Sequence, residues 1–195
     1  MPPGRRPLSH RIFSFEAAEL ILPSEITLDT SFVVNALFVG EALHEPARGF
    51  LQRLAEARSI LVFNELLELE VRETAFRIPL VERFPDDWRR RRHDGRSLRR
   101  AHRLVRGIMD AWEDLLSAFT YLEVQVAEVM DRVEELMGTF GLSSYDAVHV
   151  ATGEYAGART LVTTDAGFAS VPETRLTIYT NASRVGPCRR MRGHR

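Results

Sequence analysis

Short apolar runs alternate with segments of helical periodicity along most of the chain. The strands that this pattern predicts are one beginning at residue 26 and ending near Asp29, and residues 59–63, 119–126, 160–165 and 175–179. Buried strands that alternate with helices favour an α/β fold, layered around a mostly parallel sheet. In such a sheet, functional groups gather where the carboxyl ends of the strands meet.

Residues typical of helix ends delimit the helices between these strands. Thr30 or Ser31 is expected to cap the first helix, which runs to Phe38, and Asn64 is expected to cap a helix over residues 64–77. Further helices are predicted over residues 45–58, 127–141 and 144–156, the last two ended by Gly141 and Gly157.

The helical pattern is interrupted at Pro79 and Pro85, because proline lacks the backbone N–H that a helix needs. Beyond them, a helix is expected to resume and to reach about Leu116. This region also has the strongest charge bias: residues 77–106 contain 11 arginines and 4 acidic residues, whereas residues 110–135 are acidic. Such a block suggests a polyanion contact or a neutralising partner.

The composition, with 45% apolar and 27% charged residues in 195, is that of a soluble globular domain. No apolar run approaches the roughly 20 residues of a membrane helix, and no secretory signal is evident, so a cytoplasmic location without membrane contact is expected. The single cysteine, Cys188, cannot form an internal disulfide. All 26 basic residues are arginine, and the absence of lysine disfavours Walker-type phosphate loops, Schiff-base enzymes and protein kinases.

Three aspartates lie at what is predicted to be one edge of the sheet. Asp29 and Asp165 follow predicted strands, and Asp146 lies in the first turn of a helix. Singly, they can be explained as a helix cap, a turn residue and a favourable charge at a helix amino end. Together, two carboxylates about 4 Å apart repel by roughly 4 kcal/mol at an effective dielectric near 20, so the cluster needs a cation or must protonate. Oxygen ligands of this kind suit Mg²⁺ or Mn²⁺, which promote phosphodiester hydrolysis.

Four acidic motifs, in order along the chain, carry a family resemblance. They are ITLDTSFVVNAL, a glutamate in the helix after the second strand, LSSYDAVHVATGEYAGA and TLVTTDAGF. The pattern resembles the PIN domain family over about residues 26–180, and within that family the VapC-type toxin ribonucleases. The resemblance implies a PIN-like three-layer α/β/α fold and a Mg²⁺- or Mn²⁺-dependent endoribonuclease. It also implies an RNA substrate, a cognate antitoxin protein and a homodimer.

The same resemblance assigns roles to individual residues. It places the acidic quartet that binds metal and catalyses cleavage at Asp29, Glu70, Asp146 and Asp165. It also implies that the hydroxyls of Ser31 and Thr163 help to orient the metal or the water. Glu73, one helical turn beyond Glu70, remains the alternative fourth acid, and Glu65 and Glu68 are expected to be solvated.

The helix that carries Asp146 has further residues of interest. His149 follows Asp146 by three positions and lies on nearly the same helix face. Packing in the core is the favoured explanation for His149, and an approach to the scissile phosphate is the alternative. The small residues Ala147, Ala151 and Gly153 are expected to let this helix pack closely on the sheet.

Three segments differ from a compact PIN-like domain, which is expected over residues 26–180. Residues 1–25 form an N-terminal extension, and residues 181–195 form a basic tail that is expected to be disordered. An Arg-rich helical insertion covers about residues 78–110. Planar arginine forks suit RNA phosphates, but the insertion could instead pair with the acidic face at residues 110–135 or contact an acidic antitoxin segment.

Two other functions compete with a nuclease. A catalytically inactive PIN-like module that binds RNA or protein would gain nothing from carboxylates that repel each other in front of phosphates. A haloacid-dehalogenase-like phosphatase is suggested by Asp29 at a strand end. However, that family's second aspartate, two positions later, is absent, as is its lysine.

Overall fold

Parallel strands form one sheet in the computed structural model, which describes residues 12–185. The strand order is β1-β6-β5-β2-β3-β4, and every pairing between neighbours is parallel. The strands are β1 (Ile12–Ser14), β2 (Glu25–Leu28), β3 (Ile60–Asn64), β4 (Tyr121–Val124), β5 (Thr160–Val162) and β6 (Thr177–Thr180). The predicted α/β fold with a mostly parallel sheet is confirmed.

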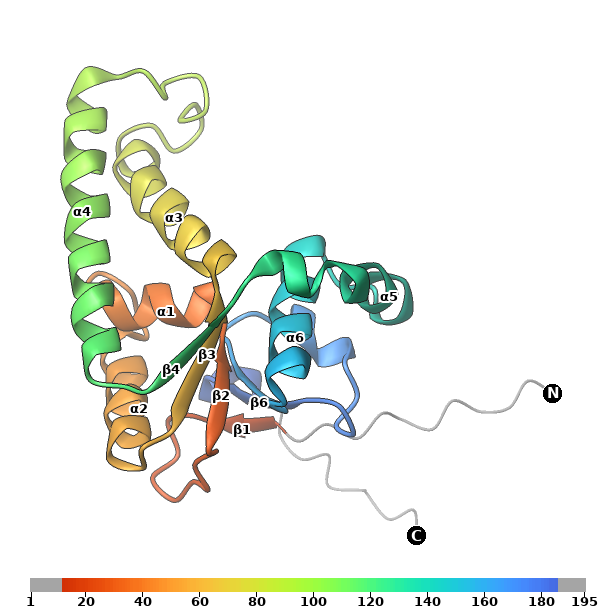
Figure 1. Cartoon of the computed structure of the whole chain (residues 1–195). Helices are drawn as coiled ribbons and strands as arrows, with labels where there is room; N and C mark the ends of the chain where they lie inside the picture. The colour runs from red at the N-terminus through yellow and green to blue at the C-terminus, as the bar shows by residue number, and fades with distance from the viewer. Residues whose placement is uncertain (1–11, 186–195) are drawn as a thin grey trace, which may run out of the picture.

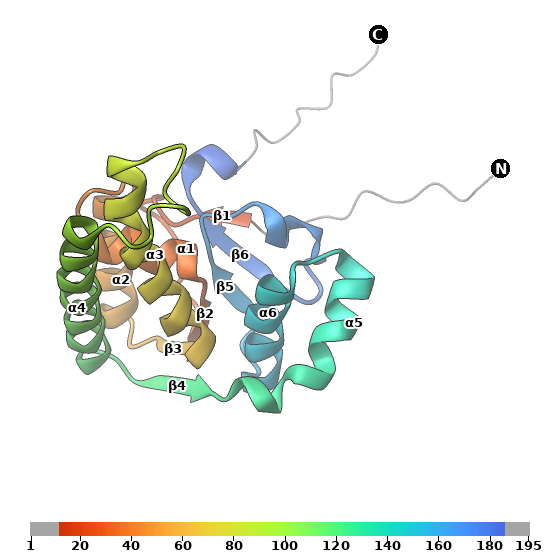
Figure 2. The same ribbon diagram turned by 90° about the horizontal axis from the view of Figure 1, so that it is seen from above.

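Helices cover both faces of this sheet (Figures 1 and 2). One face carries α1 (Thr30–Leu37), α2 (His44–Glu56), α3 (Glu65–Arg83) and α4 (Gly95–Ser117). The other face carries α5 (Met130–Phe140) and α6 (Ser144–Ala156). This gives the three layers α/β/α. No helix in the part of the chain described here is long and apolar enough to cross a membrane.

The chain changes direction in the sheet at β2. From β2 it moves to β3 and β4 through helices on one face, and it then returns through α5 and α6 on the opposite face to β5, on the other side of β2. Because the connections after β2 and before β5 lie on opposite faces, a crevice is expected beyond the carboxyl ends of these two strands. The candidate residues are found there.

The two faces of the sheet are packed by different side chains. Under α1 to α4, the rings of Phe15, Phe32 and Phe50 contact one another, and Trp112 of α4 meets Phe63 of β3 edge to face at 5.1 Å. Under α5 and α6, the core consists mainly of aliphatic side chains. Alternate positions of the inner strands β2, β3, β5 and β6 therefore face different helices, as expected for strands that are covered on both sides.

Helix caps agree with the sequence in most cases. Asn64 caps α3, and its side chain accepts a hydrogen bond from the backbone N–H of Leu67 at 3.2 Å. Gly141 and Gly157 end α5 and α6 in the left-handed conformation, with φ of 68° and 76°. These positions favour glycine because a Cβ atom would be strained there. The predicted ends of both helices are confirmed.

The cap of α1 is a different residue from the one predicted. Asp29 has an extended backbone (φ −102°, ψ 148°), and its carboxylate accepts a hydrogen bond from the N–H of Ser31. The prediction of a cap at Thr30 or Ser31 was therefore wrong, because the helix begins directly after the strand and leaves Asp29 as the last extended residue. As a result, the cap that fixes the helix is also a carboxylate of the crevice.

Pro79 lies inside α3 and does not interrupt it. The prediction of a break at this position was wrong, since α3 continues to Arg83 and ends just before Pro85, the second predicted break. Pro79 and Leu80 are buried, and α4 packs along this part of α3. The packing offsets the roughly 3 kcal/mol that proline costs in a helix.

The sheet is larger on one side and its β4 edge is shorter than the sequence indicates. β1 lies in the segment assigned to the N-terminal extension, and it pairs with β6 from Ile12 to Ser14. Three residues are too few for a strand pattern to be recognised. β4 has four residues, and the chain turns into a short 3₁₀ helix from Val126. The rest of the extension, residues 1–11, and the tail from residue 186 lie outside the described residues.

Helix α6 packs very close to the sheet, as its small residues predicted. Ala147 and Ala151 are buried, and a Cβ atom added at Gly153 would lie 2.6 Å from Oγ1 of Thr27 and 3.0 Å from the carbonyl oxygen of Ala158. We expect Gly153→Ala to destabilise the protein by about 1–3 kcal/mol, because β2 and α6 must move apart. Chemical denaturation measures this change.

A matched control is Gly138→Ala in α5. A Cβ atom at Gly138 would have nothing within 4 Å, so this substitution should stabilise the helix by about 0.5–1 kcal/mol. Equal stability of the wild type and the Gly153→Ala variant would show that the contact between α6 and β2 is not rigid.

Candidate active site

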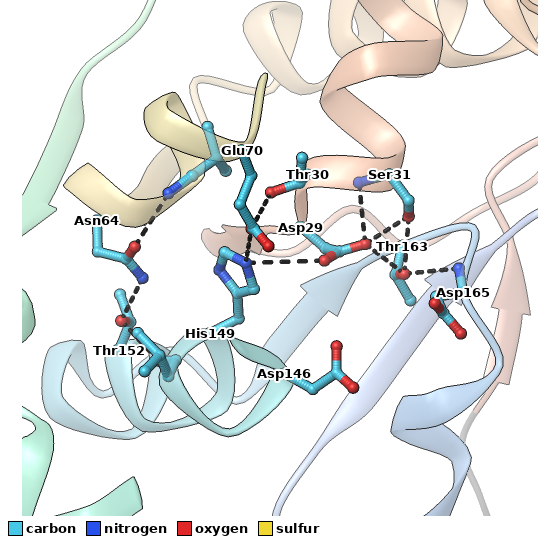
Figure 3. Close-up of polar contacts among 12 residues, drawn as sticks. Asp29, Thr30, Ser31, Asn64, Glu70, Asp146, His149, Thr152, Thr163 and Asp165 are labelled. Carbon is cyan, nitrogen blue, oxygen red and sulfur yellow. Dashed lines mark hydrogen bonds and ion pairs between the residues drawn. The ribbon is translucent and has the colours of Figure 1, made fainter. Parts of the chain in front are cut away.

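A cavity of about 360 Å³ opens beyond the carboxyl ends of β2 and β5. Four carboxylates from four separate segments line it: Asp29 after β2, Glu70 on α3, Asp146 on α6 and Asp165 after β5. Figure 3 shows the Asp146 carboxylate pointing toward Asp29, with Glu70 and Asp165 on either side. The structure thus brings together all four acidic residues that the sequence selected.

Asp29 is the most firmly held of the four. It is buried, and its Oδ2 accepts hydrogen bonds from the hydroxyl of Ser31 and, at 2.7 Å, from the hydroxyl of Thr163. The Oγ1 of Thr163 also accepts a hydrogen bond from the backbone N–H of Asp165 at 2.8 Å. Ser31 and Thr163, both candidates from the sequence, therefore tie the loop after β5 to the loop after β2.

Replacing Thr163 tests this connection. Thr163→Val keeps the shape of the side chain, but it removes one hydrogen bond to the buried Asp29 carboxylate and one from the N–H of Asp165. We expect a loss of about 2–4 kcal/mol of stability, since two polar groups lose a partner. Thr163→Ser, which keeps the hydroxyl, should lose far less. Urea denaturation of both variants distinguishes them, and equal losses would mean that the methyl group matters more than the hydroxyl.

Glu70 reaches the cavity from the second turn of α3. Its Oε2 accepts a hydrogen bond from the Thr30 hydroxyl at 2.6 Å and lies 3.0 Å from Nε2 of His149. Burial raises the pKa of Glu70, but the hydrogen bonds from His149 and Thr30 outweigh it, and the pKa lies below its ordinary value. Glu70 is therefore ionised in the neutral pH range.

The other glutamates of α3 point away from the cavity. Glu73 is exposed and pairs with Arg92 at 3.3 Å, so the structure places Glu70 and not Glu73 with the aspartates. Glu65 is exposed and accepts a hydrogen bond from the N–H of Val126. The expectation that Glu68 is solvated was wrong, because it pairs with Arg72 at 2.9 Å and accepts a hydrogen bond from the Trp112 indole at 3.0 Å.

Asp146 and Asp165 approach each other at Gly167. A Cβ atom at Gly167 would lie 3.3 Å from an Asp146 oxygen and 3.5 Å from an Asp165 oxygen. The pKa of Asp146 is raised, first by burial and then by the negative charges of Asp29 and Asp165, although a hydrogen bond with Ser143 works in the opposite direction. The folded protein thus holds Asp146 where an additional positive charge would be favourable.

His149 is packed in the core, as favoured from the sequence, and it also faces the acidic residues. Its side chain is 1% exposed and is packed in the interior. At the same time, Nε2 faces the carboxylates, 3.0 Å from Glu70 and 3.9 Å from Asp29. The imidazole therefore links the acid on α3 to the acid after β2, and its packing keeps it in that position.

The donor set has the chemistry of a divalent cation site. All four acids offer hard oxygen ligands, and the pKa of Asp146 is raised first by burial and then by the negative charges of Asp29 and Asp165. Within residues 12–185, however, no three His, Cys, Asp or Glu side chains already form a set that could hold an ion. Asp29 and Glu70 are instead engaged by hydroxyls and by His149. The residues fit Mg²⁺ or Mn²⁺ in kind, with side chains that must turn toward the ion.

The cavity is also lined by residues that the sequence motifs did not indicate, among them Thr30 and Arg77. Thr30 binds Glu70 directly, and Arg77 lines the cavity wall on α3. Arg77 follows Glu70 by seven residues, or about two helical turns, so both lie on the same face of the helix. This spacing could have identified Arg77 once Glu70 was chosen.

A family model described as the PIN domain matches residues 26–174. The chain is similar to the solved structure of VapC20 from Mycobacterium tuberculosis, a sarcin-ricin loop cleaving toxin, with 19% identity, a TM-score of 0.49 and coverage of 78% of this chain and 99% of that one. It is also similar to PAE2754 from Pyrobaculum aerophilum, with 20% identity, a TM-score of 0.44 and coverage of 83% and 87%. The chain matches no curated protein.

Proposed function

The chain belongs to the PIN domain family, and on this basis we propose that it is a metal-dependent endoribonuclease, the toxin component of a type II toxin–antitoxin module. One observation carries the proposal: four carboxylates from segments far apart in the sequence meet in one cavity beyond the carboxyl ends of β2 and β5. Like charges are costly to gather, and phosphodiester hydrolysis at a divalent cation is a chemistry that uses them.

In the proposed reaction, Asp29, Glu70, Asp146 and Asp165 hold Mg²⁺ or Mn²⁺ and Ser31 and Thr163 orient the carboxylates or the attacking water. A bound divalent ion supplies an activated water and neutralises charge on the phosphate. The chain's own part is orientation. Ser31 and Thr163 fix one oxygen of Asp29, and Thr30 and His149 fix Glu70. These contacts engage Oδ2 of Asp29 and Oε2 of Glu70, so Oδ1 of Asp29 and Oε1 of Glu70 are the oxygens that would turn toward an ion.

The partners follow from the same proposal. RNA is the substrate, a cognate antitoxin protein neutralises the enzyme, and the enzyme acts as a homodimer in the cytoplasm. A short open reading frame next to the gene that encodes an acidic or DNA-binding protein would support the toxin role. Growth arrest on expression, relieved by co-expression of that neighbour, would test it directly.

The alternative is a PIN-like module that binds RNA or protein without cutting. Calorimetric titration with Mg²⁺ or Mn²⁺ separates the two functions, because a binder has no need of a cation in the acidic cavity. Absence of metal binding would favour the binder.

The decisive experiment is cleavage. Purified protein is incubated with single-stranded and structured RNA in the presence of Mg²⁺ or Mn²⁺, beside an Asp29→Asn variant prepared in the same way. We expect internal cleavage by the wild type and none by the variant. Equal cleavage by both proteins, which would point to a contaminant, or cleavage by neither would refute the proposal.

A further inference from the structure

Arg77 is the permanently cationic residue among those that line the acidic cavity. Its side chain is exposed, and among residues 12–185 it has no carboxylate partner in an ion pair. RNA must bring its own negative charge to a cavity lined by four carboxylates. A free guanidinium on the wall is therefore suited to receive a phosphate beside the one that is cut.

Arg77 begins a strongly basic projection that we name the arginine arm, residues 77–106. The arm consists of the end of α3, the loop at residues 84–94 and the first half of α4. It extends past the carboxyl ends of the strands, the side of the sheet on which the cavity lies (Figure 1). From Glu70 to the end of α3 at Arg83, the helix rises about 20 Å, the length of roughly six nucleotides along one strand of a duplex. The arm is thus long enough to follow a bound RNA.

The ion pairs of the arm involve its own acids and a nearby acid of α3. The pairs are Arg83 with Asp94, Arg90 and Arg91 with Asp87, Arg92 with Glu73, and Arg100 with Glu82. Within the described residues, none of them reaches the acidic segment at residues 110–135. The arm is therefore not neutralised by that segment, which was one of the explanations for its charge.

A tryptophan connects Arg77 to the loop of the arm. The guanidinium of Arg77 lies 5.9 Å from the centre of the Trp88 ring, and that of Arg89 lies 5.0 Å from it. Arg89 is exposed and, like Arg77, has no ion-pair partner in the described chain. Contact with the ring holds both guanidinium groups in place while leaving their N–H donors available.

We propose that Arg77 and Arg89, held by Trp88, form a track that binds the RNA backbone next to the cleaved phosphodiester. This inference rests on the proposed function, because it assumes that RNA enters the acidic cavity. It specifies how the chain guides a polyanion to a site that repels it. Phosphate contacts start at Arg77 on the cavity wall and continue to Arg89 in the loop at residues 84–94. Contacts of this type position RNA without reading its sequence.

The test measures RNA binding without cleavage. All proteins carry Asp146→Asn, and the probe is a labelled single-stranded RNA of mixed sequence, titrated in Mg²⁺ at several salt concentrations. Each lost phosphate contact lowers the slope of log affinity against log salt by about 0.7, so Arg77→Gln with Arg89→Gln should lower it by about 1.4. At about 0.1 M salt, this corresponds to roughly 25-fold weaker binding.

The matched control is Arg99→Gln with Arg103→Gln on the exposed face of α4. These two arginines belong to the same arm and also have no ion-pair partner in the described residues, so the control removes equal charge away from the cavity. We expect less than about 3-fold weakening, and unchanged melting temperatures verify folding in both pairs.

The possible results are distinguishable from those of the cleavage experiment. Equal weakening by both pairs, no weakening by either, or no RNA binding at all would overturn the track. Unchanged RNA affinity in the variant that carries Arg77→Gln and Arg89→Gln would overturn it as well. If the wild type cleaves RNA but the track fails, the proposed function stands alone. If RNA binding needs the track but no RNA is cleaved, the proposed function fails and the binding surface remains.

Discussion

Asp146→Asn is expected to reduce RNA cleavage by about 1000-fold or more and to raise the melting temperature of the metal-free protein. The loss of rate corresponds to about 4 kcal/mol of barrier and follows from removal of one of the four carboxylates. The gain in stability follows from the raised pKa of Asp146, which is due first to burial and then to Asp29 and Asp165. A neutral amide removes both the cost of burying a charge and the repulsion from Asp29 and Asp165.

The stabilisation expected from Asp146→Asn depends on pH. A carboxyl group with a raised pKa in the folded state binds its proton more tightly when folded than when unfolded. The ionised Asp146 therefore destabilises the protein at neutral pH, and this cost disappears as the pH falls through the raised pKa toward the ordinary value of 3.8. The difference in melting temperature between the variant and the wild type should be largest near neutral pH and should shrink in acid.

Asp110→Asn is the matched control for this experiment. Asp110 is exposed on α4, away from the cavity, and its replacement should change neither cleavage nor stability appreciably. Cleavage by the Asp146→Asn protein at the wild-type rate would remove Asp146 from the site. A lower melting temperature of that variant would show that the carboxylate is stabilised in the folded protein by interactions other than those described.

Removal of divalent cations is expected to have the second large effect on RNA cleavage. With EDTA, cleavage should fall by at least about 1000-fold, and it should return when Mg²⁺ or Mn²⁺ is added in excess, because the carboxylates alone do not activate water. A readout independent of activity is thermal unfolding. At a concentration of metal about 100 times its Kd, the folded wild type should gain roughly 2.7 kcal/mol of stability.

The same titration of the Asp146→Asn protein is the control for metal binding. With one carboxylate fewer, it should gain much less stability from Mg²⁺ or Mn²⁺, whereas the Asp110→Asn protein should gain as much as the wild type. Full cleavage in EDTA would contradict the metal dependence. A large gain in stability without cleavage would instead indicate a metal-binding module that is not a nuclease.

The stability of the domain and its proposed activity thus have opposite requirements at one position. Asp146 is held among carboxylates at a cost to the folded state, while α6, which carries it, packs tightly on the sheet through Gly153. Strong packing of the helix is what keeps an unfavourable charge in place. Such opposition between stability and site chemistry is common in active sites.

Much of the architecture depends on residues close together in the sequence and could be predicted. Apolar runs identified five of the strands, and Asn64, Gly141 and Gly157 identified helix ends. The break at Pro79 was predicted wrongly because burial against α4, a contact between distant segments, decides whether the helix continues. β1 was missed because its three residues gain their stability from pairing with β6, at the other end of the chain.

The sequence by itself determined the α/β class, the family resemblance and the positions of Asp29, Asp146 and Asp165 at the ends of elements, since these depend on local pattern. Only the tertiary structure decided that Glu70 rather than Glu73 joins them, that buried His149 faces the carboxylates, and that Arg77 lies on the cavity wall. These facts depend on how α3 is rotated about its axis and how closely α6 approaches β2. Packing between residues far apart in the chain sets both.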